Sequence, residues 1–397
     1  MDKQSQILKF HVKVLKFLMI WPFDGLDPNQ NYYLMRGCFA YACFCSIPVF
    51  SGAAFQFCVG IDNVKVLLEV LVGVGNITGY NIAYVCFLKN QEKIQFLIRD
   101  FQEFVQFSGP EIIQNTEEKT TRYTKYLLGY ASIGLVITFS WQMLSTESCV
   151  AQRGGDYYVR HDPCWLPVRN WYPFDASQPK LFWIVFPIEA IYSIHICLFF
   201  SLATSTIIGF LMQITSQLQY CSNRFEHVFD EVDLKPFQQI KPDFLFLIKY
   251  HKKILDYSKK LFNVFDALIV VYISLTSFIM AIICYQIVDP KISAQDRIKY
   301  AILLIAWCLL VYLICYYGQK VQDEALKIGQ SIFKSHWYGG TTAVELKPYI
   351  LFTLARTQIP LEFKAQLFGT ISLLQFMKVM KWSYSGLTLL LAVTDED

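Results

Sequence analysis

The sequence contains few charged residues and lacks the short motifs that mark the common enzyme classes. Only 17% of its 397 residues are charged, whereas a soluble domain usually has about 25%. No G-x-S-x-G, H-E-x-x-H or P-loop motif is present, and the six histidines are too scattered to form a metal site by spacing. The net charge of +3 comes without a basic patch interleaved with aromatic residues, which argues against a nucleic-acid partner. We therefore expect no enzyme activity, no metal or other cofactor, and no nucleic-acid binding.

The first 36 residues also lack the uninterrupted apolar core and the small-residue cleavage site of a signal peptide. Lysines at positions 3, 9, 13 and 16 alternate with apolar residues. We expect an uncleaved, cytoplasmic, amphipathic segment. It either lies on the membrane surface or packs as a helix on the rest of the protein.

Apolar and aromatic residues are abundant. The chain is 54% hydrophobic and 16% aromatic, and its mean hydropathy is +0.34. These values predict an all-α, polytopic membrane protein. Because a crossing helix needs roughly 20 apolar residues, windows with little or no charge predict six spans. The six windows are 37–61, 70–88, 126–146, 181–211, 267–288 and 300–319.

A seventh span is expected at the C-terminus, although lysines divide it. Two charge-free stretches, 365–377 and 382–394, are each too short to cross and are separated by Lys378 and Lys381. We place these lysines at the cytoplasmic boundary, where their ends can reach the headgroups. Four regions follow: an N-terminal segment (1–36), spans one to six with their loops (37–319), cytoplasmic anchor helices (320–368), and the last helix with an external tail (369–397).

Lysine and arginine are unevenly divided between the two sides of the membrane. Alternate loops place 24 of them on the side of the N-terminus and eight on the other side. By the positive-inside rule, the N-terminus is cytoplasmic and the C-terminus is extracellular. This orientation is opposite to that of a G-protein-coupled receptor.

The external loop after the third span contains Cys149 and Cys164, the two of 12 cysteines that lie away from spans and cytoplasm. Because that side is oxidising, we expect a disulfide between them, with two free thiols as the alternative. The aromatic residues of this loop suit either a lid over a pocket or an aromatic belt at the membrane surface. Glu189, in the outer part of the fourth span, either lines a cavity or reaches the outer interface.

Two features predict how the helices pack. In the second span, GVGNITG (73–79) lacks dinucleotide-loop spacing, so Gly75 and Gly79 are expected to allow close helix approach. The cytoplasmic segments 240–262 and 318–336 have helical patterns and should continue spans four to six into the cytosol. The second segment has an apolar stripe of Val321, Ala325, Ile328 and Ile332. That stripe is expected to pack in a helical base, within or between subunits, with surface-lying helices as the alternative.

Three stretches near the C-terminus resemble the insect odorant receptor family. That family's segment after the sixth span resembles YGQKVQDEALKIGQSIFKSHWY (317–338), and its lead into the last helix resembles KPYILFTLARTQIPLEFKAQLFG (347–369). Its Ser-Tyr-Ser ending resembles KWSYSGLTLLL (381–391), with Leu387 where Phe is frequent. The Thr-Tyr…Gln-Phe ending of the gustatory receptors is absent. The short second cytoplasmic loop is similar to that of an odour-tuning subunit rather than the co-receptor.

The resemblance implies an odorant-gated, non-selective cation channel in the plasma membrane of olfactory sensory neurons. Four subunits would surround one pore, and the tuning subunit would form a heterotetramer with the shared odorant co-receptor, Orco. Volatile odorants would bind in the outer half of the membrane, within a bundle surrounded by membrane lipid. The last helix of each subunit would line the pore, and the cytoplasmic ends of the late helices would form the anchor between subunits.

Pore residues are expected by resemblance of position, and pocket residues by the direction of each helix. The water-excluding constriction is expected to contain Leu387, Leu390 and Leu391. The candidate ligand-binding residues are Gly73, Asn76, Ile77, Ile137, Ser140, Trp141, Leu144, Ile188, Tyr192, Phe278, Ile279 and Ile282. Apolar and aromatic walls with few polar points suit volatile ligands, and ordinary helix packing is the alternative for each residue.

Two other functions stay open at this point. A seven-helix metabotropic chemoreceptor would signal through a soluble transducer, and a gustatory-receptor-like channel would be gated by other ligands. A transporter is disfavoured because no inverted repeat or pair of matching broken helices is visible.

Overall fold

Helices make up nearly all of the computed structural model, which describes residues 7–23, 27–59, 64–144, 160–161, 163–166, 172–229, 237–290, 292, 294–335, 337 and 342–395. The helices are α1 (Lys9–Phe17), α2 (Pro28–Val59), α3 (Val64–Lys89), α4 (Gln91–Asp100), the 3-10 helix η1 (Phe101–Phe104), α5 (Val105–Leu144), α8 (Pro179–His227), α9 (Phe237–Val288), α10 (Ala294–Lys334), α11 (Thr342–Thr357) and α12 (Leu373–Asp395). In the described ranges the strands are β1 (Lys364–Ala365) and β2 (Gly369–Thr370), which pair antiparallel.

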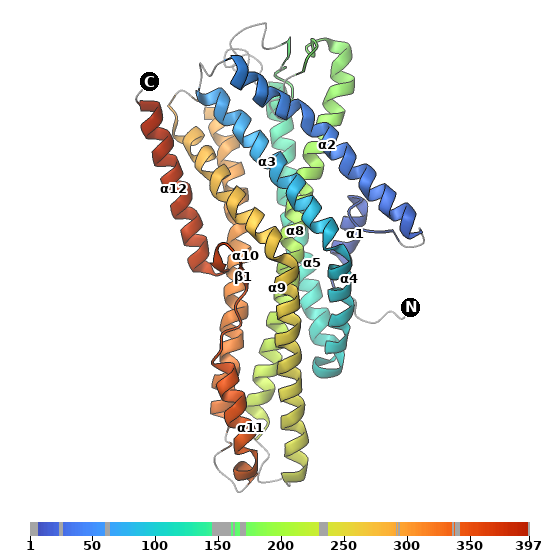
Figure 1. Ribbon diagram of the computed structural model, residues 1–397, viewed down its shortest axis with the longest axis vertical. Coiled ribbons are helices and arrows are strands. Elements are labelled where there is room, and N and C mark those ends of the chain that lie inside the picture. Colours follow the sequence, from blue (N-terminus) through green and yellow to red (C-terminus); the bar gives the residue numbers. More distant parts are fainter. Residues whose placement is uncertain are drawn as a thin grey trace.

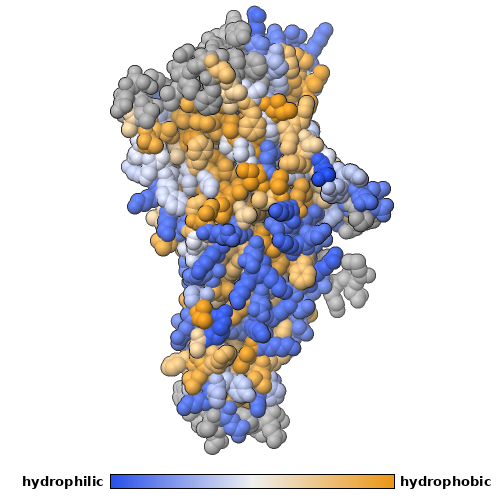
Figure 2. All heavy atoms as spheres, viewed as in Figure 1, coloured by the Kyte–Doolittle hydropathy of each residue, from blue (hydrophilic) through white to orange (hydrophobic). Residues whose placement is uncertain are grey.

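Five stretches of the described helices are long and apolar enough to cross a membrane. They are Asn29–Ala54, Val70–Lys89, Pro179–His227, Ile240–Val288 and Asp296–Lys334. α5 and α12, which contain the expected third and seventh spans, run alongside them in the upper half of Figure 1. Apolar side chains dominate that half in Figure 2, and hydrophilic side chains gather below it. The arrangement agrees with seven expected spans and a polar extension on one side.

α8 is the central helix of the bundle. Every residue from Phe199 to Thr215 is buried, with α5, α9 and α10 packed around the helix. Thr204 Oγ1 donates to Tyr272 OH of α9 at 2.7 Å. The hydroxyls of Ser205, Thr206 and Thr215 bond to the helix's own backbone one turn earlier, as in the 2.8 Å contact from Thr206 Oγ1 to the carbonyl oxygen of Leu202. Because those hydroxyls are satisfied within the helix, they can be buried at little cost. Burial on all sides also explains why this helix lacks an amphipathic pattern.

The polar extension is a helical base made within the chain (Figure 1). α8, α9 and α10 continue into it as single helices, as expected, and α10 also contacts α11. Ser222 Oγ of α8 lies 2.8 Å from Ser331 Oγ of α10. The predicted stripe is buried, at 0–6% exposure, and consists of Val321, Ala325, Ile328 and Ile332. The stripe therefore packs inside this subunit rather than on a membrane surface.

Two helix boundaries differ from those expected. α2 begins at Pro28, well before residue 37, because proline suits the first helical turn. Arg36 does not end the helix, and its guanidinium lies 4.4 Å from the ring centroid of Tyr32. α12 is one continuous helix through Lys378 and Lys381. The residues before it form the β1–β2 turn, in which Gly369 has a φ of 79°.

The N-terminal helix α1 packs on the bundle through one face. His11 and Leu15 are buried, and His11 Nε2 lies 2.7 Å from Thr124 Oγ1 of α5. We expected this segment either to lie on the membrane surface or to pack on the rest of the protein. The inner face of α1 packs on the rest of the protein. α1 lies near the polar end of the apolar half, and α12 ends at the opposite end (Figure 1).

Candidate functional site

Polar side chains from α3 and α8 meet inside the apolar half of the molecule. The hydroxyl of Tyr80 lies 2.6 Å from Nδ1 of His195. Nε2 of the same ring lies 3.0 Å from the carbonyl oxygen of Leu18, which follows α1. Because a carbonyl oxygen only accepts, Nε2 carries the proton and Tyr80 donates to Nδ1. The imidazole is thereby held in one tautomer and ties α1, α3 and α8 together.

Helical spacing brings aromatic rings to this polar pair. Tyr80 and Tyr84 are one turn apart on α3, and Tyr192, His195 and Phe199 share one face of α8. Tyr80 meets Tyr192 edge to face, with ring centroids 6.0 Å apart, and meets Phe199 likewise at 5.3 Å. Such pairs contribute about 0.5–1.5 kcal/mol beyond the burial of their area. The cluster is therefore both a packing core and a set of buried polar groups.

A second polar link joins α2 to the same cluster. Ser46 Oγ donates to the carbonyl oxygen of Ala42 at 2.8 Å and accepts from Asn81 Nδ2 at 3.1 Å. Tyr192 OH lies 2.8 Å from Ser46 Oγ, and Tyr192 is the donor because the serine proton is already used. Within the described residues, Oδ1 of Asn81 is buried without a hydrogen-bond partner. Polar residues inside membrane spans are costly, so a buried network of this kind marks a functional region by default.

The end of this region away from the polar extension is closed by the loop before α8. Glu189 is 2% exposed, and Tyr172 OH donates to its Oε1 at 2.7 Å. Tyr172 also packs with Leu166 and Val185 in a small core of its own. Glu189 is therefore buried under the loop rather than extended to the outer interface. The part of the loop that the structure describes forms a compact cap on α8.

Of the two cysteines in the expected disulfide, Cys164 lies within the described residues and Cys149 does not. Cys164 is 2% exposed and disulfide-bonded. Cys149 lies outside the described residues, so its pairing with Cys164 stays a prediction.

The structure brings only some of the predicted ligand-binding residues together. Ile77, Tyr192 and Ile279 are at most 3% exposed and share one hydrophobic core with Tyr80. Gly73 is also buried, whereas Asn76 is half-buried and donates to the carbonyl oxygen of its own helix four residues earlier. These five positions form the more buried part of the expected pocket region.

The remaining predicted residues lie elsewhere. Phe278 and Ile188 are 46% and 36% exposed, Ser140 is exposed, and Ile137 is half-buried. Ile282 belongs to a separate cluster between α3, α9 and α12. Trp141 and Leu144 lie in α5, but their side chains are not among those that the structure describes. Sequence reasoning missed four residues of the polar cluster, although one of them, His195, is an ionisable group inside a span and was a usable signal. They are Ser46, Tyr80, Asn81 and His195.

The two glycines predicted for helix approach both lie at the contact between α3 and α9, and Gly79 is the tighter of the two. A Cβ at Gly75 would meet the Phe278 ring at 3.5 Å and Ile279 at 3.7 Å. A Cβ at Gly79 would overlap the Leu275 side chain. The close approach predicted from GVGNITG is therefore confirmed at Gly79, whereas Gly75 has room for a Cβ in ordinary contact. The contact joins α3 to α9.

α12 packs against the same part of α9. Ser383 Oγ lies 3.2 Å from the carbonyl oxygen of Ser277 on α9 and 3.0 Å from that of Val379 on its own helix, so its single proton is shared between the two acceptors. A Cβ at Gly386 would lie 2.8 Å from the Cβ of Ala281, closer than real Cβ atoms approach. The small residue at 386 thus allows the close approach expected of it, and Ser383 bonds between helices.

The three leucines expected at the pore lie along this α9–α12 contact. Leu387, Leu390 and Leu391 are partly buried and pack against Ile282 and Tyr285 of α9, together with α3. The opposite face of α12 is exposed in the single chain. The large apolar residues on it include Leu374, Met377, Trp382, Tyr384 and Leu389. The pore assignment of the three leucines stays a prediction.

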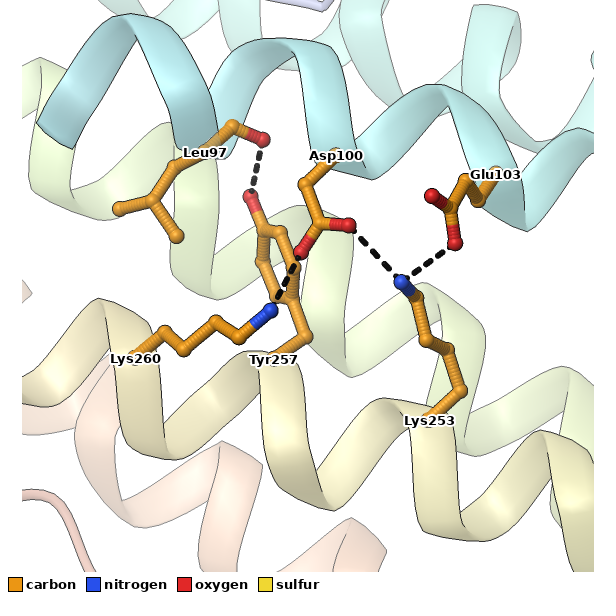
Figure 3. Close-up of polar contacts among 6 residues, drawn as sticks. All are labelled: Leu97, Asp100, Glu103, Lys253, Tyr257 and Lys260. Carbon is orange, nitrogen blue, oxygen red and sulfur yellow. Dashed lines mark hydrogen bonds and ion pairs between the residues drawn. The ribbon is translucent and has the colours of Figure 1, made fainter. Parts of the chain in front are cut away.

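The segment after α3, which contains α4 and η1, is held to α9 by ion pairs (Figure 3). Asp100 accepts from Lys253 Nζ at 2.8 Å and from Lys260 Nζ at 3.1 Å, and Glu103 accepts from Lys253 at 2.6 Å. Burial alone would raise the pKa of Asp100, but the hydrogen bonds from both lysines hold this pKa below its usual value. Tyr257 OH donates to the carbonyl oxygen of Leu97 between the two lysines. The clamp therefore sets the axial position of α9 relative to the end of α3.

Comparison with known proteins identifies relatives of this chain. The family model described as 7tm Odorant receptor matches residues 63–384. The chain is 31% identical to the putative odorant receptor 92a of Drosophila melanogaster over 36% of this chain and 34% of that protein. It is 26% identical to the odorant receptor 67c of the same fly over 55% of this chain and 53% of that protein. The aligned part thus spans about a third to a half of these relatives.

Solved structures share the whole fold. The insect olfactory receptor OR5 from Machilis hrabei matches with a TM-score of 0.77 at 16% identity, over 97% of both chains. The same receptor in complex with eugenol matches with a TM-score of 0.74 at 15% identity, over 97% of this chain and 98% of that one. This likeness confirms the predicted all-α, multi-span architecture. The relatives are receptors rather than enzymes.

Proposed function

This chain belongs to the 7tm odorant receptor family, and from that premise we propose that it is a subunit of an odorant-gated cation channel. Volatile small molecules bind in the outer half of the helix bundle and open a pore lined by α12. The chain is the tuning subunit of a heterotetramer with the odorant co-receptor. It lies in the plasma membrane of olfactory sensory neurons with its N-terminus in the cytoplasm.

The inner part of the expected pocket region has the chemistry that a volatile ligand needs. Ile77 and Ile279 supply apolar walls, and Tyr80 and Tyr192 supply rings with one polar end each. Sites for small ligands are mostly apolar with a few fixed polar groups. The complex of the Machilis hrabei receptor with eugenol, a small aromatic molecule, supports the same ligand class.

The observation that carries the proposal is the position of α9 between the ligand region and the last helix. Within two turns of α9, Phe278 and Ile279 face Gly75 of α3, while Ser277 and Ala281 face α12. A ligand that shifts α3 against α9 must therefore alter the α9–α12 contact, because packed helices do not deform continuously. The charged clamp at Asp100 holds α9 in place at Lys253 and Lys260 during that shift.

Gating is a shift between two populations of the bundle. An odorant favours the open arrangement only by the difference between its affinities for the open and closed states. Leu387, Leu390 and Leu391, which are only partly buried against α9 in the single chain, contribute to the dry constriction in the closed channel, because a ring of apolar side chains excludes water until it widens. Movement of α12 relative to α9 changes what these leucines contact.

Co-expression in a cell line tests the channel proposal. The chain would be expressed with the odorant co-receptor, with the co-receptor alone as the matched control, and currents would be recorded across a panel of volatiles. We expect some volatiles to evoke a cation current only when both chains are present. Absence of any additional response across the panel, with both chains at the cell surface, would contradict the proposal.

Tags on the two termini test the orientation separately. In intact cells we expect antibody staining of a tag at the C-terminus, and staining of a tag at the N-terminus only after permeabilisation. An external N-terminus would favour the metabotropic alternative. A current that requires a soluble transducer would do the same.

A further inference from the structure

The N-terminal helix is held in a fitted groove between α5 and α8. Leu8, at the start of α1, is 0% exposed. A Cβ at Gly209 of α8 would lie 2.5 Å from Leu8 Cδ2 and 2.9 Å from Thr120 of α5. Only glycine leaves space for this leucine. α1 is therefore docked in one position by shape, which fixes where its outer face points.

The start of α1 is also bonded to α5. Glu117 accepts from the backbone N–H of Leu8 at 2.7 Å and from that of Lys9 at 3.0 Å. The first N–H groups of a helix have no partner within the helix, and the oxygens of a carboxyl group supply acceptors for them there. Both oxygens of Glu117 are used in this way.

The outer face of docked α1 is basic. α1 contains no acidic residue, and Lys9 and Lys13 are exposed, one turn apart. Lys125 of α5 is exposed beside it, with Nζ 5.6 Å from the centroid of the Phe10 ring. Arg122 is also exposed, one turn before Lys125. In the described part of the chain none of these four cations forms an ion pair.

This basic face lies where the apolar part of the molecule ends. Lys125 is the last charge before the charge-free run of α5 that begins at Tyr126. Tyr126 is 67% exposed, and Phe17, at the end of α1, is 78% exposed. Figures 1 and 2 place α1 near the border between the apolar half and the polar half. Cations combined with exposed aromatic rings at that level are typical of a surface that lies among lipid headgroups.

We propose that the basic face formed by Lys9, Lys13, Arg122 and Lys125 binds the headgroups of anionic phospholipids. The headgroup phosphates bridge α1 to α5 and so hold α1 in its groove. A soluble acidic partner fits less well, because Phe17 and Tyr126 beside the cations need an apolar or interfacial environment. This surface is separate from the ligand region and does not depend on channel activity.

Amide hydrogen exchange in nanodiscs tests the bridge. The purified chain would be placed in phosphatidylcholine alone and in phosphatidylcholine with added phosphatidylserine. Each basic residue near an anionic surface strengthens attachment roughly fivefold, so exchange of the α1 amides should slow by about fivefold or more when phosphatidylserine is present. High salt should remove most of this slowing, because it screens exposed charges. Amides of α11, far from the patch, serve as an internal reference and should not change.

The decisive variant combines Lys9→Gln, Lys13→Gln and Lys125→Gln. All three side chains are exposed, so the variant should fold, and retained thermal stability in detergent would show it. Its α1 amides should exchange at the same rate with and without phosphatidylserine. A matched control removes three exposed lysines from the polar half, Lys249, Lys334 and Lys347.

Direct association is measured with spin-labelled phosphatidylserine and phosphatidylcholine. The native chain and the control variant should prefer the anionic lipid, and the triple variant should lose at least half of that preference. Equal preference in the native chain and the triple variant would overturn the proposal. An equal loss in the control variant would also overturn it, because the effect would then follow net charge rather than this face.

Discussion

Replacing Gly386 by alanine should force α9 and α12 apart. The new Cβ would lie 2.8 Å from the Cβ of Ala281, whereas carbon atoms in contact keep about 3.5–4.0 Å. Neither atom can rotate away, because a Cβ is fixed by the backbone. One helix must therefore shift by roughly 1 Å. That shift would also lengthen the hydrogen bond from Ser383 to the carbonyl oxygen of Ser277, now 3.2 Å.

The change in the free energy of unfolding caused by Gly386→Ala follows from two opposing effects. Overpacking a tight contact costs about 1–3 kcal/mol, while replacing glycine by alanine inside a helix gains up to about 1 kcal/mol. The net effect of Gly386→Ala should therefore be a loss of up to about 2 kcal/mol. In an Ala281→Gly background the clash is absent, and the same substitution should gain up to about 1 kcal/mol. The sign of its effect should therefore reverse between the two backgrounds.

A double-mutant cycle measures this coupling. The free energy of unfolding of the four purified proteins would be compared by thermal or denaturant unfolding in one detergent. Odour-evoked current, recorded with the co-receptor, should change in the Gly386→Ala protein and recover when Ala281→Gly is added. The same effect of Gly386→Ala in both backgrounds would refute the proposed contact between α9 and α12.

Two further substitutions test other contacts. Tyr80→Phe should lower the free energy of unfolding by about 1–3 kcal/mol, because it leaves Nδ1 of His195 buried without its donor. Tyr84→Phe on the same face of α3 removes only a weak contact with the Cys38 thiol, so an equal loss would contradict the assignment. Burial raises the pKa of Glu117 to about 7 against the opposing hydrogen bonds from Leu8 and Lys9, so docking of α1 should be strongest in acid and weaken as pH rises through 7. Glu117→Gln should remove this pH dependence from the α1 hydrogen-exchange rates, corrected for intrinsic exchange, and a slope that persists would show another group to be responsible.

The positions of the membrane helices were predictable because the signal for them is local. Each of the six windows that predicted spans one to six falls largely within one helix, and residues 240–262 and 318–334 extend the late helices as expected. The stretch 365–377 does not, because most of it forms the β1–β2 turn before α12. The helix boundaries that differed from the expected ones depended on the surroundings of individual side chains. Arg36 does not end α2 because the Tyr32 ring lies beside it. Lys378 and Lys381 do not divide α12, because both are exposed on its outer side.

The candidate site was only partly predictable. Helix direction predicted Ile77, Tyr192 and Ile279 as ligand-binding residues, and the structure buries all three in one core. Their role in ligand binding stays a prediction. It could not show that Phe278 faces Gly75 at the edge of the α3–α9 contact and remains 46% exposed. Which side of a span faces the interior depends on its rotation about its own axis, and nearly uniform apolar spans carry little information about that rotation.

The sequence by itself determined which segments are helical, which of them are apolar enough to cross a membrane, and which family the chain resembles. Those properties depend on neighbouring residues, because a helix satisfies its backbone hydrogen bonds within one segment and its transfer into lipid depends on its own side chains. Only the tertiary structure decided that Glu117 bonds to the start of α1, and that Tyr80 donates to His195. These contacts join residues more than 100 positions apart. They depend on how whole helices fit against each other, which composition and spacing do not specify.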